Sequence, residues 1–130
     1  MAFLHYSSQG TGSPLVILHG LFGSGKNWQS LARKFSASYQ VICVDLRNHG
    51  QSFHVDSMNY DLMACDVIDL LNELNIGPCC LMGHSMGGKV AMTVALKAPA
   101  LLSKLVVVDI APVAYDHQYD KRFGLMPWII

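Results

Sequence analysis

The sequence predicts an α/β fold in which a mostly parallel sheet is flanked by helices on both faces. The first observation is a set of short, continuous apolar runs, which are typical of strands covered on both sides. The second is that stretches with helical spacing of apolar residues separate these runs, with only short connections between them. Such alternation favours parallel strands joined by helical crossovers. With 130 residues and 52% hydrophobic content, the chain is long enough for one compact domain.

The elements of the first half follow from this spacing. A short strand is expected at 3–6, and the serine- and glycine-rich stretch 7–13 predicts a turn. The apolar run 14–18 predicts a buried strand. A helix is expected over about 28–35, because apolar side chains recur there every three or four residues. The run 40–45 predicts a second buried strand, followed by a polar loop.

The second half repeats the alternation. A helix is expected from about Tyr60 to Asn75, where a Gly-Pro pair ends the pattern. An apolar strand that begins at Cys79 and ends in a G-x-S-x-G turn, a helical pattern over 89–97 and a strand over 104–109 follow. These elements define a single partial domain, residues 1–130, with its core at 14–113 and no structure assigned to 114–130.

Composition limits the partners that the chain can bind. Nine basic residues balance nine acidic ones, so we expect no nucleic acid partner. No apolar run approaches the length of a membrane span, and the first residues lack the charged start and apolar core of a targeting peptide. The four cysteines lie in apolar runs without metal-ligand spacing, which predicts reduced thiols, an intracellular location and no metal site.

The stretch around Ser85 carries the clearest chemical signal. An apolar run ends in Gly83-His84-Ser85-Met86-Gly87, a G-x-S-x-G motif, and a helical pattern follows at once. Strand, sharp turn and helix in this order are typical of a nucleophile elbow, in which the serine is held in a strained backbone conformation. The two glycines leave room for the neighbouring backbone. We therefore predict Ser85 as a nucleophile.

A second loop supplies the groups that acyl transfer would need. Negative charge develops on the carbonyl oxygen when a serine attacks it, and two backbone N–H groups can stabilise that charge. One donor is expected at Met86, and the other at Leu21 or Phe22, which the sequence leaves open. His19, Gly20 and His84 are expected around the bound substrate, with His19 ordering the loop rather than acting as a base and His84 lining the site.

The same loop allows another interpretation. Residues 20–26 fit the phosphate-binding pattern G-x-x-x-x-G-K, and Asp45 could help to hold magnesium. However, Asn27 stands where a serine or threonine should ligate the metal. A P-loop nucleotide binder therefore remains the less favoured alternative.

Four ordered motifs together resemble the α/β-hydrolase superfamily. They are His19-Gly20-Leu21-Phe22-Gly23-Ser24, Asp45-Leu46-Arg47-Asn48-His49-Gly50-Gln51-Ser52, Gly83-His84-Ser85-Met86-Gly87-Gly88-Lys89 and Val108-Asp109-Ile110-Ala111-Pro112-Val113. They look most like the small esterase branch that includes bacterial short-acyl esterases and mitochondrial abhydrolase-domain proteins. The resemblance implies a serine hydrolase of acyl esters or thioesters that forms an acyl-enzyme, uses no cofactor and is cytoplasmic or mitochondrial. It also implies that Asp45 and Arg47 tie loops together.

The chain departs from the family after the fourth motif. Family members are longer and place the acid and then the catalytic histidine after the serine, so we expect a core without its last strands, its lid and its base. Asp109 is the candidate acid, and His117 is the one histidine that follows it. A serine without a base is a weak nucleophile, so the chain alone is expected to be weak or inactive, or a non-catalytic binding fragment. His5, His49 and His54 are interpreted as surface or loop groups, and the edge strand near 105–108 predicts self-association.

Overall fold

A five-stranded sheet forms the centre of the computed structural model, which describes residues 2–108. The strand order is β1-β3-β2-β4-β5, and only β1 runs antiparallel to its neighbour. The strands are β1 Tyr6–Gln9, β2 Ser13–Leu18, β3 Tyr39–Val44, β4 Cys79–His84 and β5 Leu102–Val108. The predicted, mostly parallel α/β fold is confirmed.

The predicted first strand is displaced. The sequence suggested 3–6, whereas β1 pairs Tyr6 with Val44 and Gln9 with Val41. Its residues are polar and largely exposed because β1 is an edge strand, where the backbone ladder alone holds the segment. Leu4, which precedes it, packs in the core at 2% exposure.

Three helices and two short 3₁₀ turns connect the strands. The helices are α1 Gln29–Phe35, α2 Tyr60–Leu74 and α3 Met86–Lys97, and the 3₁₀ turns are η1 Gly25–Trp28 and η2 Pro99–Leu101. The prediction for α2 is confirmed at both ends. Its first turn is capped by the Asn59 side chain, which accepts a hydrogen bond from the Leu62 N–H at 2.8 Å. It ends at Asn75, whose left-handed φ of 52° stops the helix.

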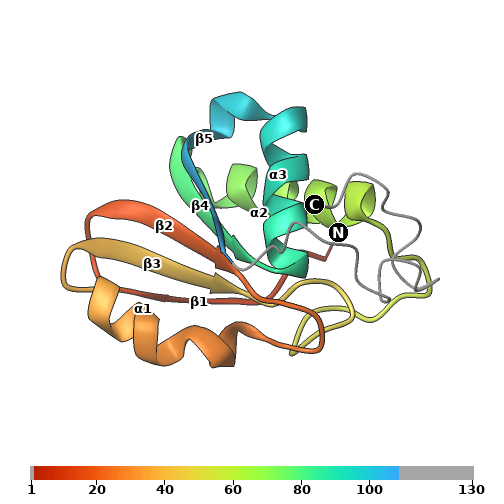
Figure 1. The fold of residues 1–130 in the computed structure, drawn as a ribbon, viewed down its shortest axis with the longest axis horizontal. Helices are drawn as coiled ribbons and strands as arrows, with labels where there is room; N and C mark the ends of the chain where they lie inside the picture. Colours follow the sequence, from red (N-terminus) through yellow and green to blue (C-terminus); the bar gives the residue numbers. More distant parts are fainter. Residues whose placement is uncertain (1, 109–130) are drawn as a thin grey trace.

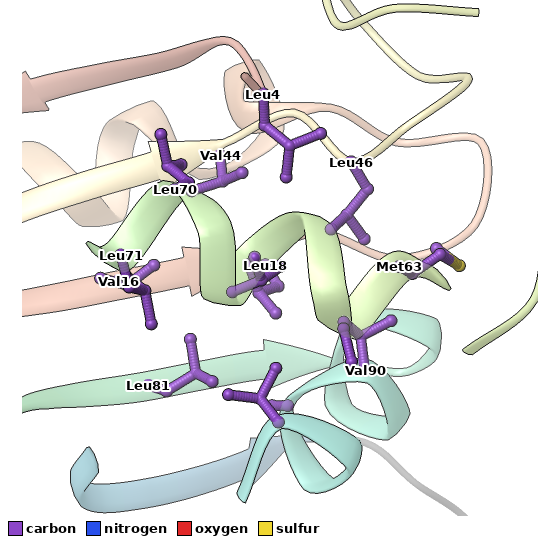
Figure 2. Packing of buried hydrophobic residues seen from close by; sticks show 14 of the residues in the cluster. Leu4, Val16, Leu18, Val44, Leu46, Met63, Leu70, Leu71, Leu81 and Val90 are labelled. Atoms are coloured by element: carbon purple, nitrogen blue, oxygen red, sulfur yellow. The ribbon is translucent and has the colours of Figure 1, made fainter. Parts of the chain in front are cut away.

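The helices cover both faces of the sheet, as predicted. Figure 1 shows α1 against one face and α2 and α3 against the other. Alternate residues of β2 serve the two layers: Val16 and Leu18 face α2 and α3, whereas Leu15 and Ile17 face α1. Figure 2 shows the larger cluster, in which side chains of β2 and β4 meet those of α2 and α3. This double burial explains the continuous apolar runs.

The carboxyl ends of the central strands meet at one edge of the sheet. Leu18 is in register with Val44 on one side and with Gly83 on the other. The loop after β2, the loop after β3 and the turn after β4 therefore lie together, at the edge where open α/β sheets bind ligands.

The outer edge of β5 is apolar. Leu105, Val106 and Val107 are 36–39% exposed, and no strand within residues 2–108 pairs with this edge. None of the helices in this part of the chain has the length and apolarity to cross a bilayer.

Candidate active site

Ser85 occupies a one-residue turn between β4 and α3. Its φ of 52° and ψ of −113° lie outside the regions that most side-chain-bearing residues adopt. The strain, on the order of 1–3 kcal/mol, persists only because the surroundings over-determine it. One such contact is the Ser85 N–H, which donates to the Val108 carbonyl at 3.0 Å. The predicted backbone strain at Ser85 is confirmed.

Two glycines make this turn possible. A Cβ on Gly83 would lie 2.1 Å from the carbonyl oxygen of Gly87, and a Cβ on Gly87 would lie 2.4 Å from that of Leu18. Both distances are far below contact distance, so any side chain at either position would force the backbone apart. The G-x-S-x-G spacing therefore follows from the close approach of α3 to the ends of β2 and β4.

The loop after β2 makes a tight turn beside it. The Gly23 N–H donates to the Gly20 carbonyl at 3.0 Å, which leaves Leu21 and Phe22 as the central residues. Phe22 has a φ of 60°, the sign expected at the third position of a type II turn, where glycine is usual. Phe22 is also 72% exposed, which is unusual for a phenylalanine.

The two candidate N–H donors in this turn are not equivalent. The Phe22 N–H donates to His49 Nε2 at 3.1 Å. No hydrogen bond within the described residues uses the Leu21 N–H. The Met86 N–H belongs to the first turn of α3, where backbone donors have no acceptor inside the helix. Of the alternatives left open by the sequence, this geometry favours Leu21.

His19 is a buried residue whose ring hydrogen-bonds to both the loop after β2 and the loop after β3. Its ring is fully buried, with Nδ1 2.7 Å from the Gly20 carbonyl and Nε2 3.0 Å from the Leu46 nitrogen. Because a carbonyl can only accept and an N–H can only donate, the ring is the neutral Nδ1–H tautomer. Burial lowers its pKa to about 4, further than the hydrogen bond to the Gly20 carbonyl raises it. These contacts fit the predicted loop-ordering role and leave His19 without a substrate-facing surface.

His49 links the same two loops, and it was interpreted as a surface or loop group: it lies in the loop after β3, but it is buried rather than at the surface. The ring is 8% exposed and has Nδ1 2.9 Å from the Arg47 carbonyl. Its Nε2 accepts from the Phe22 N–H, and its ring lies 5.0 Å from that of His19, centroid to centroid. The two imidazoles thus join the loops after β2 and β3. The sequence held no local signal for this role, because Phe22 is 27 residues away.

Asp45 holds the second loop against η1. Its carboxylate accepts from the Gly25 N–H at 2.6 Å and the Gln51 N–H at 2.9 Å, and it pairs with His5 at 3.1 Å. Burial favours the neutral acid, but the hydrogen bonds from Gln51, Gly25 and His5 hold the pKa of Asp45 below its ordinary value. The predicted loop-tying role is confirmed.

Arg47 has a different partner. Its guanidinium forms a two-pronged pair with Asp66 of α2, with nitrogen–oxygen distances of 2.6 and 2.9 Å, and also donates to the Ser57 carbonyl. Together these contacts fix the loop after β3 to α2. The sequence had predicted the loop-tying role without identifying Asp66.

The P-loop alternative is wrong. A phosphate loop needs free backbone N–H groups, but here the Ser24 N–H donates to Asn27 Oδ1 at 2.7 Å and the Gly25 N–H donates to the Asp45 carboxylate. A carboxylate therefore occupies a donor that a phosphate in the loop 20–26 would require. Among residues 2–108, no group of three or more His, Cys, Asp or Glu side chains could hold a metal ion.

Two cavities adjoin the turn after β2. The first, of about 410 Å³, is lined by residues 20–23 with Asn27, Trp28 and His84, and we call it the tryptophan cavity. The second, of about 400 Å³, is lined by Leu21, Phe22, Asn48, His54, Val55 and Met58 among others, and we call it the methionine cavity. Gly20 and His84, both expected near the substrate, lie in the first. The contribution of Trp28, whose ring lies 5.5 Å from that of His84, was not foreseen.

Two candidate residues, Asp109 and His117, lie outside the described residues. The preceding residue, Val108, ends β5 opposite His84 and accepts the hydrogen bond from Ser85.

Comparison with known proteins gives a consistent family assignment. A family profile described as an alpha/beta hydrolase fold matches residues 13–129. The chain is 47% identical over 113 residues to a putative esterase/lipase of Haemophilus influenzae, covering 86% of this chain and 39% of that protein. It is 50% identical over 109 residues to the sn-1-specific diacylglycerol lipase ABHD11 of Danio rerio, covering 82% and 34% of the two chains. Esterase YbfF of Escherichia coli is 45% identical over 118 residues, covering 90% and 46%.

Solved structures agree. A marine microorganism esterase superposes with a TM-score of 0.84 at 44% identity, over 89% of this chain and 45% of that one. E-2-(acetamidomethylene)succinate hydrolase gives a TM-score of 0.83 at 28% identity, over 90% and 44%. The chain spans less than half the length of each of these relatives.

The burial of His19 predicts a loss of stability in acid. The pKa of its ring is about 4 in the folded protein and about 6.5 when exposed, so the unfolded chain binds more protons between these values. The free energy of unfolding should therefore fall as pH drops from 6.5 to 4, by up to about 1.4 kcal/mol per pH unit from this residue. Urea unfolding across this range measures the slope.

Substitution separates His19 from other titrating groups. His19→Asn should be less stable at pH 7, because the buried Leu46 N–H loses its acceptor, but its stability should fall less steeply in acid. The matched variant His54→Asn alters an exposed histidine and should keep the parent slope. Equal slopes in His19→Asn and the parent would contradict the assignment of the acid effect to His19.

Proposed function

Because this chain belongs to the α/β-hydrolase fold family, we propose that it carries the nucleophile and oxyanion donors of a serine hydrolase that acts on acyl esters or thioesters. The observation that carries the proposal is the strained turn at Ser85, at the start of α3 and beside the loop after β2. Relatives named esterase or lipase support ester substrates. Thioesters rest on the sequence resemblance alone.

In the proposed reaction, Ser85 Oγ attacks the carbonyl carbon and gives up its proton to a general base. The N–H groups of Met86 and Leu21 stabilise the negative charge on the former carbonyl oxygen. The alcohol or thiol then leaves with a proton, and water hydrolyses the acyl-enzyme to release the acid and regenerate the hydroxyl. No step in this sequence requires a cofactor.

Two buried histidines near Ser85 are excluded as the general base, and Asp109 is the proposed acid. Neither His19 nor His49 can serve as the base, since both nitrogens of each ring are engaged. We keep Asp109 as the candidate acid, because it directly follows Val108, the hydrogen-bond partner of Ser85. Until a base is identified, weak turnover by residues 1–130 alone is also part of the proposal.

The state of the four cysteines is the basis on which we propose an intracellular location. Cys43, Cys65, Cys79 and Cys80 are all free thiols. Burial raises the pKa of Cys43 and Cys79 to about 11, which keeps both protonated and unreactive. Unpaired thiols are typical of a reducing compartment and support an intracellular location, cytoplasmic or mitochondrial.

A serine-reactive phosphonate tests the nucleophile. A fluorophosphonate should attach to Ser85, because the strained turn and the converging N–H groups favour attack on its tetrahedral phosphorus. Mass spectrometry of the peptide that contains Ser85 measures the modification and its rate. Ser85→Ala should lose the label, and the matched variant Ser38→Ala, which removes an exposed hydroxyl, should keep it. Equal labelling of Ser85→Ala and the parent, or none of either, would instead support a non-catalytic binding fragment.

Proline substitution tests the second donor. Leu21 is the second residue of the turn closed by Gly20 and Gly23, a position that proline favours, so Leu21→Pro should preserve the turn while it removes the N–H together with the leucine side chain. Labelling should slow by about 10²- to 10³-fold, as for other losses of one oxyanion donor. Rates are compared after circular dichroism has established equal melting temperatures.

Leu21→Ala is the control for this substitution. It removes the same side chain, keeps the N–H and should label at close to the parent rate. If Leu21→Pro and Leu21→Ala label equally fast, the Leu21 N–H is not the second donor.

Self-association through β5 is the partner interaction that we propose. The outer edge of β5 has apolar side chains on both faces, and such edges pair with strands of other molecules. Sedimentation velocity should show association that increases with concentration and is weakened in Val106→Lys, because a charge opposes edge pairing. The control Leu96→Lys places the same charge on α3 at a side chain that is 86% exposed, and should associate like the parent. A monomer at all concentrations would contradict the proposal.

A further inference from the structure

Lys89 is a buried lysine whose side-chain nitrogen has no partner among the described residues. It is the fourth residue of α3 and only 1% exposed, yet its Nζ makes no hydrogen bond within residues 2–108. An unpaired charge in a protein interior is costly, and burial lowers the pKa of Lys89 for this reason. Lys89 therefore needs either a counter-charge or the loss of its proton.

The elements that pack most closely against α3 supply no carboxylate for this role. They are α2, β2, β4, β5 and η2, and only α2 among them carries acidic residues. Two of these, Asp61 and Asp66, already pair with other basic side chains. The other two, Asp69 and Glu73, are exposed and so lie apart from a group that solvent does not reach.

The remaining acidic residues of the described chain do not pair with Lys89 either. Asp45 is bound to two backbone N–H groups and to His5, and Asp56 is exposed in the loop before α2. If Lys89 keeps its proton, its counter-charge has to come from outside residues 2–108.

Two hydrogen bonds converge on Ser85 and bring Lys89 close to the end of β5. The Lys89 N–H donates to the Ser85 carbonyl at 3.2 Å, and the Ser85 N–H donates to the Val108 carbonyl at 3.0 Å. Side chains in a helix lean toward its amino end, so the long stem of Lys89 is directed toward Ser85 and Val108. The residue that follows Val108 in the chain is Asp109, which carries a carboxylate.

We propose that the ammonium of Lys89 pairs with the carboxylate of Asp109 and holds the candidate acid beside Ser85, which makes Lys89 a positioning residue. This role rests on the proposed serine hydrolase function, whereas the ion pair itself does not. The amino end of α3 favours the pair, because the helix dipole stabilises an anion there and destabilises a lone cation. Asp116 and Asp120 come later in the chain, and neither follows a residue that contacts Ser85.

The ion pair serves the acid in two ways. A carboxylate has two oxygens, so one can bind Lys89 while the other is left to orient a base. A neighbouring ammonium also lowers the pKa of a carboxylic acid, which keeps Asp109 anionic. Lys89 thus fixes the acid to the same helix that carries the Met86 N–H, and a rigid element holds both groups.

Titration of the lysine side chains by NMR tests the ion pair. In the full chain labelled with ¹³C and ¹⁵N lysine, the signal of Lys89 is the one that is lost in Lys89→Met. Lys89 should remain an ammonium from about pH 6 to about pH 9, because a paired charge keeps its proton despite burial. In Asp109→Asn its pKa should fall by about one unit or more, whereas Asp116→Asn and Asp120→Asn should leave it unchanged.

The reciprocal measurement follows the carboxylate. With ¹³C-labelled aspartate, the pKa of Asp109 should rise by about one unit in Lys89→Met, because the acid loses its neighbouring cation. The matched variant Lys97→Met removes the same charge from the same helix, but Lys97 pairs with Asp61, so the titration of Asp109 should not change. A lysine that only filled space in the fold would likewise leave the pKa of Asp109 where it was.

Three results would overturn the inference: Lys89 is a neutral amine in the parent chain near neutral pH, its titration is the same in Asp109→Asn as in the parent, or Asp116→Asn or Asp120→Asn changes it instead. The first result needs no variant, so it does not depend on whether a substituted chain folds. A failure of the proposed function looks different. If the titrations establish the pair while no phosphonate labels Ser85, the pair stands and the nucleophile does not; labelling of Ser85 without the pair has the opposite meaning.

Discussion

The close approach of two backbones at Gly87 is the constraint on which the rest of the site depends. A Cβ at this position would lie 2.4 Å from the Leu18 carbonyl oxygen and 2.5 Å from that of His19, so only glycine lets the first turn of α3 reach the end of β2. This contact brings the first turn of α3 against His19, the first residue of the loop that follows β2. It also leaves a single residue, Ser85, to connect β4 to α3, which explains the strained backbone there.

Buried hydrogen bonds, in addition to apolar packing, hold the loops around that turn. Leu46, Phe53 and Met58 anchor the loop after β3 to the core, and side-chain groups bound to backbone groups fix the shape of the loops. His19 and His49 each donate through Nδ1 to a carbonyl and accept through Nε2 from an N–H, and Asp45 accepts two N–H groups. Because a buried donor without a partner costs more than a bond gains, such a network gives the loops one favoured conformation. A site that must hold N–H groups in place benefits from this rigidity.

Most of the fold could be predicted from the sequence because its signals are local. Apolar runs indicated the buried strands, and the ends of α2 followed from the apolar spacing after Tyr60 and the stop after Asn75. The first strand was misplaced because β1 is a polar edge strand, which is stabilised by pairing with β3 rather than by its own pattern. The burial of His49 in its loop was not predicted for a related reason: its partner, the Phe22 N–H, is distant in the sequence and comes close only in the folded chain.

The sequence by itself determined the α/β class, the strand-turn-helix around Ser85 and the need for glycine on both sides of it, since these depend on residue types a few positions apart. Only the tertiary structure decided which N–H of the turn after β2 is already engaged and which side chain pairs with Arg47. Each of these depends on contacts between segments far apart in the chain. Such contacts exist only once the carboxyl ends of β2, β3 and β4 have been brought to one edge of the sheet.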